Sequence, residues 1–213
     1  MTSMVANEPG VVYLVDDEAV VRDALVFLLG SRGLLVHAFD SGPALLDFLE
    51  QATSPVRGVF LLDVRMEPMS GLRLHEELVA RGHRNPLLFL SGHGDIPMVV
   101  EALKKGAFDF LEKPYSDNTL VDRVEQALAV EAASYAQDAL AVERQARLAS
   151  LSDREREVMH RVAAGKLNKV IADELHIAVR TVEVHRARVF SKLGVRSAAE
   201  LAGWLAAQGP TGS

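Results

Sequence analysis

An unbroken apolar run, Gly58–Leu62, leads directly into the carboxylate of Asp63. A run this short, with no polar alternation, is typical of a strand that is buried on both faces. The run Val11–Val15 has the same character and leads into Asp16 and Asp17. If the two strands are parallel and adjacent, three carboxylates meet at the carboxyl edge of one sheet, which is where open α/β sheets bind their ligands.

Three like charges at one edge need a cation to neutralise them. Hard oxygen ligands beside a phosphate favour Mg²⁺. The sequence therefore predicts a Mg²⁺ site where these strands end.

Residues 1–116 predict a doubly wound α/β domain with a five-stranded parallel sheet, because apolar runs alternate with segments of helical periodicity. The expected strands cover residues 11–15, 34–39, 58–62, 87–90 and 108–111, and the expected helices cover residues 18–30, 41–51, 70–81 and 96–105. Ser41 and Ser70 are expected N-caps, and Gly106 is expected just beyond the fourth helix. Such a domain places helices on both faces of the sheet.

Two further polar side chains follow strands of this sheet, Ser91 after the fourth and Lys113 after the fifth. We find no general base placed to activate water and no recognisable pocket for an organic substrate. An Asp carboxylate can itself attack phosphorus, and Mg²⁺, a hydroxyl and a lysine would then neutralise the transferred oxygens. The residues therefore favour phosphoryl chemistry at the sheet edge.

The stretches Ser91–Met98 and Lys105–Pro114, together with the acidic residues, resemble the receiver domain of bacterial two-component response regulators, and the FixJ-like subgroup in particular. The resemblance implies a flavodoxin-like fold and a cis peptide bond before Pro114. It implies that Asp63 accepts the phosphoryl group. It implies Mg²⁺ ligation by Asp17, Asp63 and the backbone carbonyl of Arg65, with Asp16 acting largely through water. It also implies that Ser91 and Phe110 are switch residues and that Lys113 pairs with the phosphoryl group.

Two residues depart from the family pattern. Ser91 stands where the family usually has threonine, which keeps the hydroxyl and loses the methyl group. Glu67 stands in Met66-Glu67-Pro68, where the family usually reads Met-Pro-Gly. We expect Ser91 to retain its function and Glu67 to alter Mg²⁺ affinity or phosphoryl lifetime.

Residues 117–147 predict a helical linker that continues the last receiver helix, because no glycine or proline occurs between positions 115 and 164. Asp117 is the expected cap of this helix. Its apolar stripe beyond Val130 is weak, so both a solvated spacer and a coiled coil remain open.

Residues 148–213 predict a small all-α domain of four helices. Ser152 and Glu155 have capping-box spacing, Gly165 ends the first helix, and Gly194 ends a third helix over 179–193. The second and third helices form a helix-turn-helix, with a fourth from Ser197 to about residue 207. Residues 151–213 carry ten Lys or Arg against seven Asp or Glu, whereas the rest of the chain is acidic. This balance suggests a polyanion-binding end.

Four stretches of this segment, around Ser152, Asn168, Thr181 and Lys192, resemble the LuxR-type DNA-binding domain. The resemblance implies that the third helix reads the major groove, with Glu183 able to accept from cytosine N4. Ala178 replaces the usual serine, so this helix should lack a side-chain cap. The implied DNA contacts are Lys169, Arg180, Thr181, Val182, Glu183, His185, Arg186 and Arg188.

The whole sequence predicts a phosphorylation-dependent transcriptional regulator and not a turnover enzyme. The expected partners are a sensor histidine kinase, promoter DNA, a second copy of the chain after phosphorylation, and RNA polymerase. A phosphatase of the haloacid-dehalogenase type is a weaker alternative, because Arg65 stands where that chemistry needs a second aspartate. A phospho-switch that acts on protein partners is a third. The chain has no cysteine, no apolar run long enough for a membrane span and no secretory signal, so a cytoplasmic protein is expected.

Overall fold

The computed structural model describes residues 10–92 and 96–207. The chain forms two compact units, which divide between Tyr135 and Ala136. The strands of the first unit are β1 (Val11–Val15), β2 (Leu35–Phe39), β3 (Val59–Asp63), β4 (Leu87–Ser91) and β5 (Asp109–Glu112). Its helices are α1 (Ala19–Ser31), α2 (Gly42–Gln51), α3 (Gly71–Ala80), α4 (Ile96–Lys104) and the first part of α5 (Asp117–Ala149).

The strands form one parallel sheet in the order β2-β1-β3-β4-β5, which confirms the predicted doubly wound domain. β1 and β3 are adjacent, with Val15 opposite Leu62. The predicted strands are correct to within one residue at each end. Asp63 is the last residue of β3 and not the first residue after it, because the ladder continues to an Asp63–Leu90 pair.

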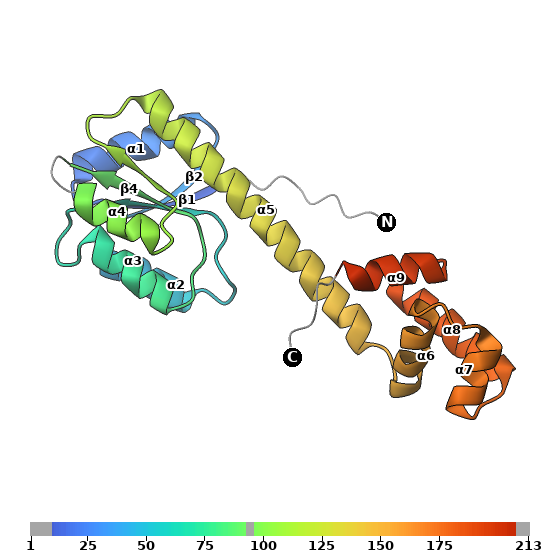
Figure 1. Ribbon diagram of the computed structural model, residues 1–213. Helices are drawn as coiled ribbons and strands as arrows, with labels where there is room; N and C mark the ends of the chain where they lie inside the picture. The colour runs from blue at the N-terminus through green and yellow to red at the C-terminus, as the bar shows by residue number, and fades with distance from the viewer. Residues whose placement is uncertain (1–9, 93–95, 208–213) are drawn as a thin grey trace. The chain divides into compact units, whose positions relative to one another are not determined.

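Alternate residues of each strand enter two separate cores, one on either face of the sheet. Phe60 and Leu62 of β3 pack on the face covered by α2, α3 and α4, whereas Val59 and Leu61 pack on the face covered by α1 and α5 (Figure 1). β3 and β4 are buried at every position. This double burial explains why their sequences are apolar without alternation.

Helix capping follows the predictions only in part. Ser70 accepts a hydrogen bond from the backbone N–H of Arg73, as an N-cap should. Ser41 occupies the N-cap position of α2, but its hydroxyl bonds to the neighbouring Asp40 instead. The expectation for Asp117 is wrong, because it is the first residue of α5 and the hydroxyl of Ser116 receives the Thr119 N–H.

Helix α5 is continuous over 33 residues, as the absence of glycine and proline predicts. Its buried residues all lie in the first three turns, where it packs on the sheet. Farther along, the two carboxylate oxygens of Glu131 accept from Nε and Nη2 of Arg57, whose guanidinium also lies 3.8 Å from the ring centre of Tyr135. Pairing of α5 with a second copy stays a prediction. Within the described residues, no helix combines the length and apolar character that crossing a membrane requires.

The second unit contains the end of α5 and the helices α6 (Asp153–Ala163), α7 (Asn168–Leu175), α8 (Val179–Leu193) and α9 (Ala198–Ala206). The capping box of Ser152 and Glu155 is present, and Gly194 ends α8 in the left-handed conformation. Ala178 provides no side-chain cap for α8, as expected. Helices α6, α7 and α8 pack around one apolar core with α9, and Trp204 lies against it.

Candidate functional site

Three side chains from separate strand ends converge at the carboxyl edge of the sheet. The ammonium of Lys113 lies 2.6 Å from one carboxylate oxygen of Asp63 and 3.7 Å from Asp16 Oδ2. Asp16 and Asp63 are both buried, and Lys113 is 30% exposed. The Lys113–Pro114 peptide bond is cis, as the family resemblance implies. Two buried carboxylates therefore share one cation.

Backbone groups hold the two carboxylates in place. The N–H of Glu18 donates to Asp16 Oδ1 over 2.9 Å, and the N–H of Arg65 donates to Asp63 Oδ2 over 2.7 Å. The guanidinium of Arg22 donates to the carbonyl oxygen of Asp16 over 2.7 Å. Arg22 therefore positions the loop that carries the aspartates. Its spacing after Asp16, one helical turn into α1, is the signal that sequence reasoning did not use.

The other predicted site residues differ in how far their side chains are buried. Asp17 is exposed and accepts a hydrogen bond from the Glu67 N–H over 3.3 Å. Ser91 is fully buried, and its hydroxyl has no hydrogen-bond partner among the described residues. Phe110 is half-buried against the core under α4. Ser91 and Phe110 thus lie on the neighbouring strands β4 and β5.

Burial and charge pairing act against each other at this site. Burial raises the pKa of Asp16, while the Glu18 N–H and the charge of Lys113 act against it. Burial alone would lower the pKa of Lys113, but its hydrogen bond and charge attraction with Asp63 outweigh burial and raise it. Lys113 is therefore a firmly charged ammonium, which is the state needed to bind transferred phosphoryl oxygens.

The donor set fits a hard cation in its chemistry, because it consists of carboxylate and carbonyl oxygens. Asp16 Oδ2 supports the fit, since it is buried without a hydrogen-bond partner. In the part of the chain that the structure describes, no three His, Asp or Glu side chains are arranged to hold a metal ion. The ammonium of Lys113 lies between Asp16 and Asp63 instead. The predicted Mg²⁺ ligands thus remain a prediction.

Gly71, the first residue of α3, approaches the end of β3 more closely than any side chain would allow. A Cβ on Gly71 would overlap the carbonyl oxygen of Asp63 and lie 3.0 Å from its carbonyl carbon. The N–H of Gly71 donates to the carbonyl of Val64 over 3.0 Å. Gly71 therefore allows α3 to close on the end of β3. Sequence reasoning missed this role, although the Ser70-Gly71 pair at a helix start was visible.

The second unit presents one face of α8 to solvent. One of the exposed residues on this face is apolar: Val184, which is 42% exposed. The predicted contacts that are also exposed are Lys169, Arg180, Thr181, Glu183 and Arg188. Arg180 lies 3.6 Å from Glu183, so this face carries both charges.

Three predicted DNA contacts are less accessible than expected. The prediction for Val182 is wrong, because its side chain is 0% exposed in the helical core. Arg186 is half-buried, donates to Asn168 Oδ1 and lies over the ring of Phe190. His185 is also half-buried, with a buried Nδ1 that has no partner among the described residues. Val184 lies four residues from both Arg180 and Arg188, so helical spacing would have identified it as a solvent-facing valine of α8.

Known proteins match both units. The family model for the response regulator receiver domain matches residues 12–125, and that for bacterial regulatory proteins of the luxR family matches residues 149–205. The transcriptional regulatory protein TdiR of Thauera aromatica is 45% identical to this chain, covering 89% of it and 82% of TdiR. The transcriptional regulatory protein FixJ of Bradyrhizobium diazoefficiens is 43% identical, covering 90% of this chain and 92% of FixJ.

Solved structures of similar proteins cover almost the entire chain. The response regulator StyR, solved at low resolution, superposes with a TM-score of 0.87 at 39% identity, covering 93% of this chain and 99% of that one. Full-length FixJ from B. japonicum superposes with a TM-score of 0.59 at 41% identity, covering 95% and 98%.

Proposed function

The chain belongs to the response regulators that join a receiver domain to a LuxR-type DNA-binding domain, and we propose that phosphorylation of Asp63 controls its binding to promoter DNA. Its relatives are transcriptional regulatory proteins, and it is a transcriptional regulator of that kind. The contact of Lys113 with Asp63, 2.6 Å long and partly buried at the sheet edge, carries the proposal. Asp63 combines a position at the end of β3 with a lysine ammonium 2.6 Å from its carboxylate.

The phosphoryl donor is a phosphohistidine of a sensor kinase. The carboxylate of Asp63 attacks phosphorus, an O–P bond forms, and the N–P bond breaks with its electrons returning to the imidazole. Asp16, Asp17, Asp63 and the carbonyl of Arg65 would hold Mg²⁺, which neutralises phosphoryl oxygens when bound. Lys113 keeps its charge and moves from the carboxylate to the phosphoryl oxygens. In this proposal Asp63 accepts the phosphoryl group and does not catalyse turnover of a substrate.

The new charge is transmitted through Ser91 and Phe110. The buried hydroxyl of Ser91 lacks a partner among the described residues, so a phosphoryl oxygen on Asp63 supplies one. Phe110 is half-buried and turns inward when Ser91 moves. The altered face then pairs with a second copy, and two DNA-binding units engage paired half-sites. Shifting such an equilibrium from 1:99 to 99:1 needs about 5.5 kcal/mol, supplied jointly by phosphorylation and dimer contacts.

Beryllofluoride, a phosphoryl mimic, tests this proposal with Mg²⁺ present. We expect it to dimerise the wild-type chain and to raise affinity for a selected DNA fragment by about 10- to 100-fold. Sedimentation and fluorescence anisotropy measure the two effects. Asp63→Asn is the control and should show neither. An equal response in Asp63→Asn, or none in the wild type, would refute the proposal. A steep loss of affinity with salt separates DNA binding from a switch that acts on proteins alone.

The buried and exposed valines of α8 test the DNA-binding face. We expect Val184→Ala to leave folding unchanged. It should weaken binding to the selected fragment by about 1 kcal/mol, because the shorter side chain buries less apolar surface in the groove. Val182→Ala should instead lower the stability of the second unit by about 1–3 kcal/mol, because it opens a cavity in the core. Anisotropy titrations and urea unfolding measure the two quantities. The opposite pattern would restore Val182 as the DNA contact.

A further inference from the structure

A cavity of about 330 Å³ lies between α3 and α4, and none of the residues assigned to phosphorylation lines it. Its apolar walls include Leu72 of α3 and Pro97, Met98 and Ala102 of α4. The volume falls at the lower end of the range for small-molecule sites, which are mostly apolar with a few polar groups. The cavity therefore has the size and lining of a site for a small organic molecule.

One polar side chain in this lining, His75, is almost fully buried. His75 is 4% exposed, and neither of its ring nitrogens is among the buried side-chain atoms of the described residues that lack a hydrogen-bond partner. Its ring meets the edge of Phe89 at 5.8 Å and also lines a smaller cavity of about 60 Å³. His75 lines the cavity, so its imidazole is a polar group that a molecule in the cavity would meet.

The protonation state of His75 defines what it offers. Burial lowers its pKa, and the nearby charge of Glu76 only partly offsets this. The imidazole is therefore neutral near pH 7, with one N–H donor and one nitrogen acceptor. A neutral ring of this kind suits a hydroxyl or amine group better than a carboxylate.

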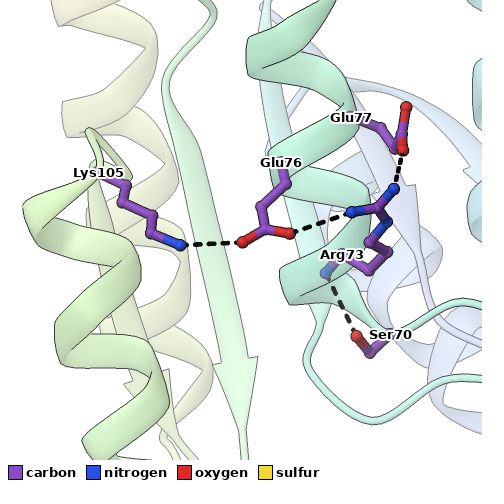
Figure 2. A network of polar contacts seen from close by, with 5 residues as sticks. All are labelled: Ser70, Arg73, Glu76, Glu77 and Lys105. Atoms are coloured by element: carbon purple, nitrogen blue, oxygen red, sulfur yellow. Dashed lines mark hydrogen bonds and ion pairs between the residues drawn. The ribbon is translucent and has the colours of Figure 1, made fainter.

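Ion pairs connect the two helices that form the cavity walls. Lys105, just after α4, contacts Glu76 of α3 at 2.9 Å, and the other oxygen of Glu76 accepts from Arg73 over 3.4 Å (Figure 2). Arg73 also pairs with Glu77, and its N–H donates to Ser70 at the start of α3. These ion pairs link α3 to the end of α4 beside the cavity.

The charges at the cavity favour an uncharged ligand. The two carboxylates in the lining are already paired, Glu76 with Lys105 and Glu101 with Lys104, so the cavity offers no uncompensated charge to an ionic ligand. We propose that this cavity binds an uncharged ring compound with one hydroxyl or amine group, which hydrogen-bonds to His75 between the apolar walls. The site is distinct from the phosphorylation site and gives the chain a ligand-binding function of its own.

A pair of naphthalene compounds tests the proposal on the full-length chain. We expect 2-naphthol to bind saturably with a Kd below about 1 mM, as its size allows, measured by isothermal titration calorimetry. We expect 2-naphthoate, which has the same rings and a negative charge, to bind at least about tenfold more weakly. Absence of saturable 2-naphthol binding, or equal affinity for 2-naphthoate, would overturn the proposal.

Matched variants of α4 locate the binding. Met98→Trp fills the cavity mouth and should weaken 2-naphthol binding at least about tenfold, whereas Val100→Trp lies outside the lining and should not change it. Equal affinities in these two variants would place the ligand elsewhere. His75→Phe keeps the aromatic packing on Phe89 but removes the nitrogens, and it should also weaken binding about tenfold. Undiminished binding in His75→Phe would remove His75 from the site.

Discussion

Gly71→Ala is expected to destabilise the receiver unit by about 3 kcal/mol and to slow phosphorylation of Asp63. A Cβ at position 71 overlaps the carbonyl oxygen of Asp63, and a backbone atom has no rotamer with which to move away. Either α3 retreats from β3 or the end of β3 shifts. A shift of β3 displaces the Asp63 carboxylate from Lys113, because their 2.6 Å contact depends on the position of the strand.

Gly30→Ala is the matched control for Gly71→Ala. Gly30 also lies in a receiver helix, but no atom lies within 4 Å of the position that its Cβ would occupy. Alanine there should stabilise the unit by about 0.5–1 kcal/mol through helix propensity. Hydrogen exchange of the β3 amides measures the stability of the receiver unit in both variants. The time course with acetyl phosphate measures the rate of Asp63 phosphorylation. Equal stability of the two variants would show that Gly71 makes no critical approach.

Glu155→Ala is expected to destabilise the DNA-binding unit by about 2–3 kcal/mol. The Glu155 side chain is 4% exposed, and one oxygen accepts from the Ser152 N–H over 2.9 Å and from Lys192 over 2.6 Å. Alanine removes half of the capping box and the anion that pairs with Lys192. Trp204 is the chain's single tryptophan and lies in this unit, so its fluorescence during urea unfolding reports this change alone.

The lowered pKa of Glu155 predicts how the stability of the DNA-binding unit depends on pH. The hydrogen bond from Lys192, with those from Ser152, lowers the pKa of Glu155 in the folded state. Its contribution is therefore fully present above the unfolded pKa of about 4.3 and is lost as the pH falls through the folded value. Wild type and Glu155→Ala should converge in stability at acid pH.

The matched control for Glu155 is a second glutamate on the same helix. Glu157→Ala should change stability by at most about 0.5 kcal/mol, because its pair with Arg154 is solvent-exposed and screened. A loss in Glu157→Ala as large as that in Glu155→Ala would show that helix charge, and not the buried contact, stabilises the unit.

Local sequence patterns predicted most of the fold. The apolar runs identified all strands of the sheet to within one residue, because strands buried on both faces tolerate few polar residues. The capping box at Ser152 and the glycine at 194 depend only on neighbouring residues, so sequence alone placed them correctly. Aspartate and serine suit the N-cap position equally well, so the sequence does not distinguish Asp117 from Ser116. Only the backbone path selects Ser116.

For the candidate site, the sequence by itself determined which residues stand at strand ends, and this grouped Asp16, Asp63 and Lys113. Only the tertiary structure decided which side chains are buried and which segments approach each other closely. It assigned Val182 to the core and Val184 to solvent, brought Gly71 against the carbonyl of Asp63, and buried His75 in the lining of a cavity between α3 and α4. Strand-end position is set by local periodicity, whereas burial and close approach depend on contacts between segments far apart in the chain.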